Sequence, residues 1–263
     1  AEELDMVVEK PNFWKFTGDA SLQFTQNYFS PNWYQGGDNF YSLLALANLK
    51  ALYDNQQGLQ WETTLEMKLG FQTNKGDTVH SMKSFNDQIR LTSKLGYKAA
   101  KNWNYASQVQ AWTQFLPSFE TNSRRYTSSF AAPLDVVVSM GMDWKIELKH
   151  FKASLYLAPI AYSMRYVQYL YTYNKTDYPE INLTRHHGVE EGTRFTHHYG
   201  PNLTFSFTWE ICENVKWDSR LYVMTDIHRT LGEFENTFTF TINKFLNAKL
   251  YLYPRYDAAD YKY

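Results

Sequence analysis

The chain has 263 residues and a formal net charge of −1, and aromatic residues make up 18% of it, with 21 Tyr and 18 Phe. A charge this close to zero gives no basic surface for nucleic acid, so we expect no nucleic-acid partner. The single cysteine, Cys212, excludes an intrachain disulfide framework and most cysteine-rich metal sites. No run approaches about 18 consecutive apolar residues, so no membrane-spanning helix is predicted.

Residues 1–12 are acidic and include Pro11. They show neither the basic start nor the apolar core of a secretory signal peptide. We therefore interpret them as a mature N-terminus left after signal cleavage, and as a short periplasmic extension that precedes the first strand.

Apolar and polar residues alternate over long stretches from Trp14 onward. The clearest stretch, Gly58–Gln72, has an almost wholly apolar row on one side and a polar, charged row on the other. Successive side chains of a strand point to opposite faces, so this pattern predicts a strand with one apolar and one polar face. Strands are predicted over residues 14–24, 40–53, 58–72, 89–98, 103–115, 134–144, 151–162, 203–211, 217–223, 238–242 and 248–252.

These strands favour a transmembrane barrel over a large soluble β-sandwich, whose strands also alternate. Gly58–Gln72 supplies the roughly 9–11 residues that a tilted transmembrane strand needs. Short and long connections alternate along the chain, as the periplasmic turns and extracellular loops of outer-membrane barrels do. Tryptophans beside the short turns predict an aromatic girdle at the periplasmic membrane interface. They are Trp61, Trp103, Trp144, Trp209 and Trp217.

Eleven strands are predicted, and an odd number of strands does not close an antiparallel barrel. Bacterial single-chain barrels normally have an even number of strands, and an open edge in lipid leaves backbone groups unpaired. We therefore expect an all-β, antiparallel, up-and-down barrel of about 12 strands over residues 13–263, with its terminal strand missing. A strand miscounted near residues 151–162 is the alternative.

Four blocks carry a family resemblance: NWYQGGDNFYSLLALANLKA, WETTLEMKLGFQTNKGDTVH, RLTSKLGYKAAKNW and FENTFTFTINKFLNAKLYLYPRYD. Over Phe13 to Asp257 the chain resembles an uncharacterised, domain-of-unknown-function family of Bacteroidota outer-membrane β-barrel proteins. The resemblance implies an outer-membrane location, no known catalytic chemistry, and one more alternating strand after the PRYD segment. It also suggests larger outer-membrane assemblies as partners, including the β-barrel assembly machinery.

Charged residues on the polar rows are predicted to line the interior of the barrel. One interpretation is a selectivity lining for small ions or solutes, and the other is a mutually neutralising network that fills a modest lumen. The mixed signs favour the network. Its predicted members are Glu62, Glu66, Lys68, Arg90, Lys94, Lys98, Asp143, Glu210, Asp218 and Arg220.

The loop NWYQGGDN offers two interpretations. Gly36 and Gly37 tolerate the positive φ angles of a turn. With Trp33 and Tyr34 beside them, the loop is alternatively a docking site, because exposed aromatic residues anchor protein interfaces.

The sequence gives little support for a metal site or an enzyme. His186 and His187, and His197 and His198, form adjacent pairs without a spaced ligand motif, so no metal and no cofactor is predicted. A hydrolase needs a nucleophile, a base and an orienting group in one place, and no such set is predicted.

We therefore expect an integral protein of a Gram-negative outer membrane, with its N-terminus in the periplasm and no enzymatic activity. The favoured function is that of an accessory or structural subunit of a multi-protein outer-membrane complex. Its expected partners are membrane lipids, other barrels and surface lipoproteins. The alternative function is a narrow, porin-like channel for ions or a small solute.

Overall fold

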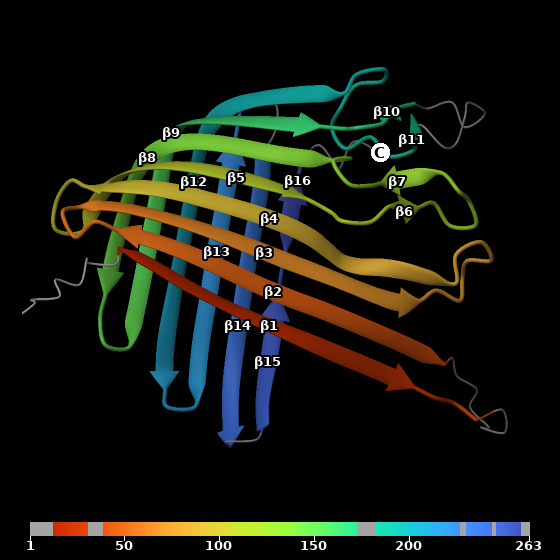
Figure 1. The fold of residues 1–263 in the computed structure, drawn as a ribbon, viewed down its shortest axis with the longest axis horizontal. Coiled ribbons are helices and arrows are strands. Elements are labelled where there is room, and N and C mark those ends of the chain that lie inside the picture. The colour runs from red at the N-terminus through yellow and green to blue at the C-terminus, as the bar shows by residue number, and fades with distance from the viewer. Residues whose placement is uncertain (1–12, 31–38, 173–181, 227–229, 244–245, 259–263) are drawn as a thin grey trace, which may run out of the picture.

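The computed structural model describes residues 13–30, 39–172, 182–226, 230–243 and 246–258 (Figure 1). The described residues form an all-β structure that contains one large antiparallel sheet and one small sheet. The strands are β1 (Trp14–Asn27), β2 (Phe40–Asp54), β3 (Leu59–Thr73), β4 (Met82–Lys98), β5 (Trp103–Thr113), β6 (Ser118–Phe119), β7 (Tyr126–Ser128), β8 (Leu134–Glu147), β9 (Phe151–Tyr166), β10 (Leu170–Tyr171), β11 (Asn182–Leu183), β12 (Phe195–Cys212), β13 (Val215–Thr225), β14 (Thr230–Asn243), β15 (Leu246–Leu252) and β16 (Arg255–Asp257).

The large sheet is a meander in the order β1-β2-β3-β4-β5-β8-β9-β12-β13-β14-β15. Its eleven strands match the eleven stretches of alternating residues, which confirms the predicted all-β, antiparallel fold. β15 and β16 pair with successive parts of the same edge of β14. They are therefore two segments of one edge strand, interrupted at Tyr253 and Pro254.

Three strand beginnings were predicted wrongly, β9 extends past its predicted end to Tyr166, and β6, β7, β10 and β11 lie in segments assigned to loops. β4 begins at Met82, β12 begins at Phe195, and β14 begins at Thr230, although these beginnings were assigned to loops. At each place the backbone pairs with a neighbouring strand where the sequence is too polar to alternate clearly. At the start of β14 the polar residue Glu233 lies on the interior face, which is why its surroundings resembled a loop.

The large sheet curves strongly, so that β1–β4 cross in front of β12–β14 (Figure 1). Its polar face is the concave one, because side chains of β4 and β14 meet across it. Two glycines lie at irregular positions of the pairing, Gly141 and Gly200. A Cβ atom on either would clash with the carbonyl oxygen of Leu157 or Thr225 respectively. Only glycine allows this close backbone approach, which is typical of bends in strongly curved sheets.

The convex face carries many exposed apolar side chains. Phe16, Leu22 and Phe24 on β1 are 63–74% exposed, and Ile160 on β9 is 75% exposed. Exposed apolar surface of this kind is typical of faces that contact a partner protein or lipid.

The two edge strands of the large sheet run in the same direction. β1 leads into the long connection 28–39, and β15 follows the short connection 244–245, so both run from the short-connection end to the loop end. Among the described residues, β1 and β15 do not pair with each other. Every residue of β1 is exposed, as expected for an edge strand.

The two longest connections fold together at the loop end of the sheet. They contribute the small sheet β10-β11-β7-β6 (Figure 1). Its core consists of Ala132, Val167, Tyr171, Leu183 and Val189, which are 0–4% exposed. These long connections therefore form a packed unit with its own apolar core rather than open loops.

The described part of the chain contains no helix that is long and apolar enough to cross a membrane.

Candidate functional site

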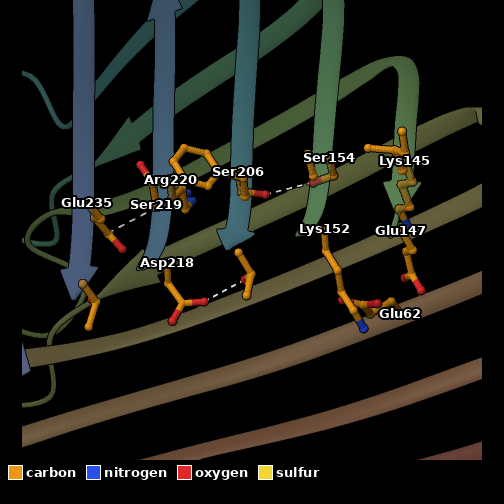
Figure 2. Close-up of a pocket in the computed structure, with 15 residues that line it drawn as sticks. Glu62, Lys145, Glu147, Lys152, Ser154, Ser206, Asp218, Ser219, Arg220 and Glu235 are labelled. Atoms are coloured by element: carbon orange, nitrogen blue, oxygen red, sulfur yellow. Dashed lines mark hydrogen bonds and ion pairs between the residues drawn. The ribbon is translucent and has the colours of Figure 1, made fainter. Parts of the chain in front are cut away.

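A polar cavity of about 460 Å³ opens at the short-connection end of the concave face (Figure 2). The Oγ atoms of Ser154 and Ser206 are 2.8 Å apart, and Thr208 Oγ1 donates a 2.7 Å hydrogen bond to Asp218 Oδ1. Charged side chains of both signs complete the lining: Glu62, Lys145, Glu147, Lys152, Asp218, Arg220 and Glu235.

A second cavity of about 370 Å³ adjoins the first, because Arg220 and Glu235 line both. It extends toward β1–β4 and is lined there by Asp19, Glu66 and Lys68. The two cavities show that the polar rows of distant strands line a common space on the concave face.

Glu233 is the most highly connected carboxylate of this interior. Its oxygens lie 3.8 Å from Arg90 Nη2, 3.7 Å from Arg220 Nη1 and 3.8 Å from Arg255 Nε. These arginines belong to β4, β13 and β16, and Glu233 itself is 7% exposed. A single buried carboxylate therefore links strands from both halves of the sheet.

A second ion pair joins β4 to β8. Lys94 Nζ lies 2.7 Å from Asp143 Oδ2, and Lys145 Nζ lies 3.3 Å from the same oxygen. Lys94 also lies over the ring of Tyr156, whose hydroxyl is 2.9 Å from Ser139 Oγ. Asp143 is 2% exposed, so the two lysines compensate the negative charge of a buried carboxylate.

An apolar layer lies between these polar cavities and the loop end. Its members point into the concave side from β5, β8, β9, β13 and β14: Trp112, Val137, Ala161, Tyr222, Met224 and Leu231. Tyr222 and Met224 lie closer to the loop end of β13 than Asp218 and Arg220 do. The wall formed by β13 and its neighbours therefore becomes apolar beyond Arg220, while Glu233 on β14 places a charged group directly opposite Tyr222.

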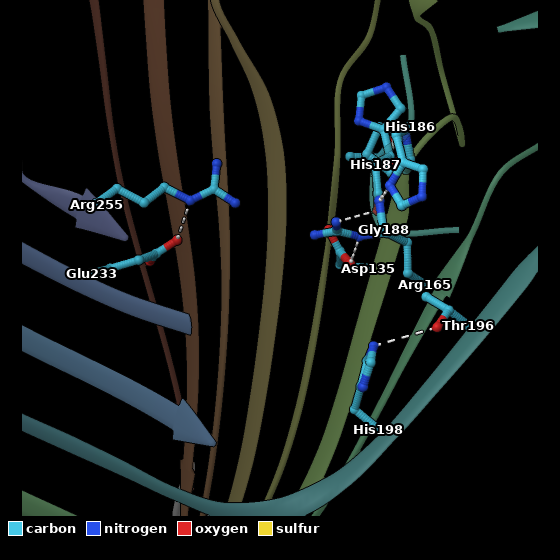
Figure 3. A network of polar contacts seen from close by, with 11 residues as sticks. Asp135, Arg165, His186, His187, Gly188, Thr196, His198, Glu233 and Arg255 are labelled. Carbon is cyan, nitrogen blue, oxygen red and sulfur yellow. Dashed lines mark hydrogen bonds and ion pairs between the residues drawn. The ribbon is translucent and has the colours of Figure 1, made fainter. Parts of the chain in front are cut away.

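A third cavity, of about 240 Å³, lies on the loop side of this layer. Arg165 lines this cavity, and its Nε and Nη2 donate to the two carboxylate oxygens of Asp135 at 2.6 and 3.1 Å. Arg165 Nη1 donates to the backbone oxygen of His187 at 2.6 Å (Figure 3). His187 Nε2 in turn lies 2.7 Å from the backbone oxygen of Thr127. The small sheet is thus fastened to the large one through Arg165.

Residues 24–119 match DUF3078, a family described as a protein of unknown function. The predicted resemblance to an uncharacterised domain family is confirmed over this segment, whereas an origin in Bacteroidota stays a prediction. Comparisons with curated proteins and with solved structures gave no match.

The DUF3078 segment runs from the end of β1 through β6. It contributes one partner to each of two interior ion pairs. Arg90 and Lys94 lie within it, whereas their partners Glu233 and Asp143 lie outside it. The polar interior is therefore built jointly by the DUF3078 segment and the rest of the chain.

Eight of the ten residues predicted to line the interior lie on the concave face. Glu62 pairs with Lys50 at 3.0 Å, and Glu66 and Lys68 line the second cavity. The other five are Arg90, Lys94, Asp143, Asp218 and Arg220. The remaining two, Lys98 and Glu210, lie near the ends of β4 and β12 beside short turns, and their part in the network stays a prediction. Glu210 is exposed and its Oε2 lies 3.2 Å from His150 Nδ1.

Sequence reasoning missed several residues of the interior, above all Glu233, Glu235, Arg165 and Tyr222. The alternation in TLGEFENTFTF places Glu233 and Glu235 on one row. This signal could have extended the predicted strand back to Thr230. Nothing in the sequence signals the pairing of Arg165 with Asp135, because it depends on the register of β8 and β9.

The five tryptophans of the predicted girdle all lie near the short connections. Trp103 is directly opposite Trp144, and Trp209 is opposite Trp217 with ring centroids 6.5 Å apart. Trp61 packs against Trp14 at 5.8 Å. Their position at a membrane interface stays a prediction. Trp33, Tyr34, Gly36 and Gly37 of the predicted docking loop lie outside the described residues.

The paired histidines point to different partners. His197 Nδ1 lies 2.7 Å from the hydroxyl of Tyr162, and His198 Nδ1 lies 2.6 Å from Asp226 Oδ2. In the part of the chain that the structure describes, no three His, Cys, Asp or Glu side chains are grouped to hold a metal ion.

Proposed function

We propose that the chain is an integral outer-membrane β-barrel with a non-conducting interior, acting as an accessory or structural subunit of a multi-protein outer-membrane complex. The exposed apolar convex face, the polar concave face and the division into short and long connections support a barrel whose short turns lie in the periplasm. β1 and β15 run in the same direction, so one strand running the opposite way would pair antiparallel with both. Such a strand would complete a barrel of about 12 strands.

The apolar layer carries the choice of a structural role over a channel. A water-filled channel needs a continuous polar path, and apolar constrictions exclude water and ions. Here Tyr222, Met224 and Leu231 form an apolar cluster on the wall of β13 and β14, between the polar cavities and the loop end. The mutual pairing of the interior charges also supports a filled interior.

The first experiment is gentle detergent extraction of native outer membranes, followed by pull-down through a tagged copy and quantitative mass spectrometry. We expect stoichiometric recovery of a larger barrel and surface lipoproteins, and the β-barrel assembly machinery is the first assembly to look for. Recovery of the protein alone contradicts the accessory role. Trp33→Ala with Tyr34→Ala tests the docking loop, because only a docking role predicts that the partner is lost while the barrel remains folded.

A narrow channel is the second candidate, and the two charged cavities favour it. Glu62→Gln with Glu66→Gln changes the ion selectivity of planar-bilayer currents only if the interior conducts. An absence of single-channel currents in the unmodified protein excludes this candidate.

A further inference from the structure

The cavity on the loop side of the apolar layer has a lining unlike that of the two deeper cavities. Three arginines contribute to it: Arg165 from β9, Arg185 from the connection between β11 and β12, and Arg255 from β16. The side chains of Arg165 and Arg255 extend toward each other from opposite walls (Figure 3). Thr113, Gln88 and Gln114 add neutral polar groups.

The two carboxylates of this cavity already accept hydrogen bonds. Asp87 accepts from the backbone N–H groups of Phe115 and Leu116 at 2.8 and 2.9 Å. Asp135 binds both nitrogens of Arg165 described above. Glu233 lies 3.8 Å from Arg255 but is shared with Arg90 and Arg220. Three arginines and two aspartates line the cavity, so its lining carries a net positive formal charge.

We propose that this loop-side cavity binds a phosphate-type oxyanion, with Arg185 and Arg255 as the principal ligands. Arg165, held by Asp135 and the backbone oxygen of His187, supplies a further positive charge beside them. The planar guanidinium fork matches a phosphate oxygen pair and forms strong, charge-assisted hydrogen bonds. The cavity volume of about 240 Å³ is below that of a typical cavity for a drug-sized ligand. The cavity therefore fits a single phosphate group and only a small part of the molecule to which that group is attached. The group comes either from free phosphate or from the phosphorylated sugar of a surface glycolipid.

The test uses the full chain, purified in detergent. Inorganic phosphate and pyrophosphate are titrated by calorimetry against the unmodified protein and against Arg185→Gln with Arg255→Gln. We expect saturable binding that weakens about tenfold or more in the double variant, because each lost charge-assisted hydrogen bond is worth more than a neutral one. Arg124→Gln is the matched control, since Arg124 is exposed on the same side but does not line the cavity.

The outcomes distinguish the proposal from its alternatives. Absence of saturable binding, equal binding by the double variant, or an equal loss in Arg124→Gln each overturns it. Near-normal circular dichroism and heat stability of the double variant show that a loss does not come from misfolding. Nanodiscs that contain a phosphorylated glycolipid or its dephosphorylated form then identify the source, and tighter binding to the phosphorylated form points to the glycolipid. This site is independent of the proposed accessory role, because phosphate binding does not require a protein partner.

Discussion

Glu233 Oε2 on β14 lies 3.8 Å from Arg90 Nη2 on β4, although these strands are separated by five others in the order of the sheet. Only a sheet that curls around its polar face brings them together. The same carboxylate faces Arg220 and Arg255 on the strands that flank β14, so it joins β4 to this half of the sheet across the concave face.

Replacing this hub carboxylate should destabilise the fold. Glu233→Gln leaves the charges of Arg90, Arg220 and Arg255 without their shared partner. We expect a loss of about 1–3 kcal/mol in the free energy of unfolding, because removing one member of a buried ion pair leaves the others desolvated. Urea-induced unfolding of the protein in lipid vesicles measures it. Glu235→Gln is the matched control, since Glu235 is more exposed and pairs with Arg220 at 3.3 Å, and it should cost less than about 1 kcal/mol.

The Lys94–Asp143 pair should behave as a coupled unit. Asp143→Asn leaves Lys94 buried without its counter-charge, and we expect a loss of about 3–5 kcal/mol. Adding Lys94→Met should recover most of this loss, because the uncompensated charge is removed. A double-mutant cycle of unfolding free energies checks this. Additive effects of the two substitutions would show that the pair does not act as a unit.

The apolar layer should be the barrier to ion flow. Tyr222→Ala with Met224→Ala removes its two contributions from β13 and should produce single-channel currents where the unmodified protein gives none. Leu221→Ala on the opposite face of the same strand is the control and should remain silent. Silence of the double variant, in protein shown to be folded, would place the barrier elsewhere. The empty space left by the two substitutions should also lower the free energy of unfolding, by about 3–5 kcal/mol for Tyr222→Ala alone.

Acid should loosen the connection between β3 and β4. Asp77 Oδ1 accepts hydrogen bonds from the backbone N–H groups of Val79 and His80 at 2.8 and 3.0 Å. Burial alone would raise the pKa of Asp77, but the backbone hydrogen bonds of His80, Val79 and Asn122 outweigh it and lower the pKa below its ordinary value. The carboxylate therefore stabilises this connection above the ordinary pKa, and the contribution is lost as the pH falls through the lowered pKa.

Hydrogen exchange of residues 74–81 measures this effect. We expect slow exchange at pH 7 and faster exchange at about pH 3, after correction for the intrinsic rate. Asp77→Asn should exchange fast at both pH values, while Asp87→Asn, a matched carboxylate that holds the next long connection, should leave this segment unchanged. Equal protection of Asp77→Asn at pH 7 would contradict the role of the carboxylate.

Alternation of side chains predicted most of the large sheet, because the period of two is a local property of each strand. It located β2, β3 and β5 closely and separated the polar row of Glu62 and Glu66 from the apolar one. It failed where histidines, a glycine and a proline interrupt the alternation, as at the start of β12, since there only pairing with β9 defines the strand.

The sequence by itself therefore determined the all-β class, the number of strands in the meander and the polar row to which charges such as Glu62 and Glu66 belong. Only the tertiary structure decided which charges meet, because Arg90 and Glu233, or Arg165 and Asp135, come together through sheet curvature and strand register. It also decided that Tyr222, Met224 and Leu231 form one apolar layer, because three residues on two strands become neighbours only when those strands pair and curl inward.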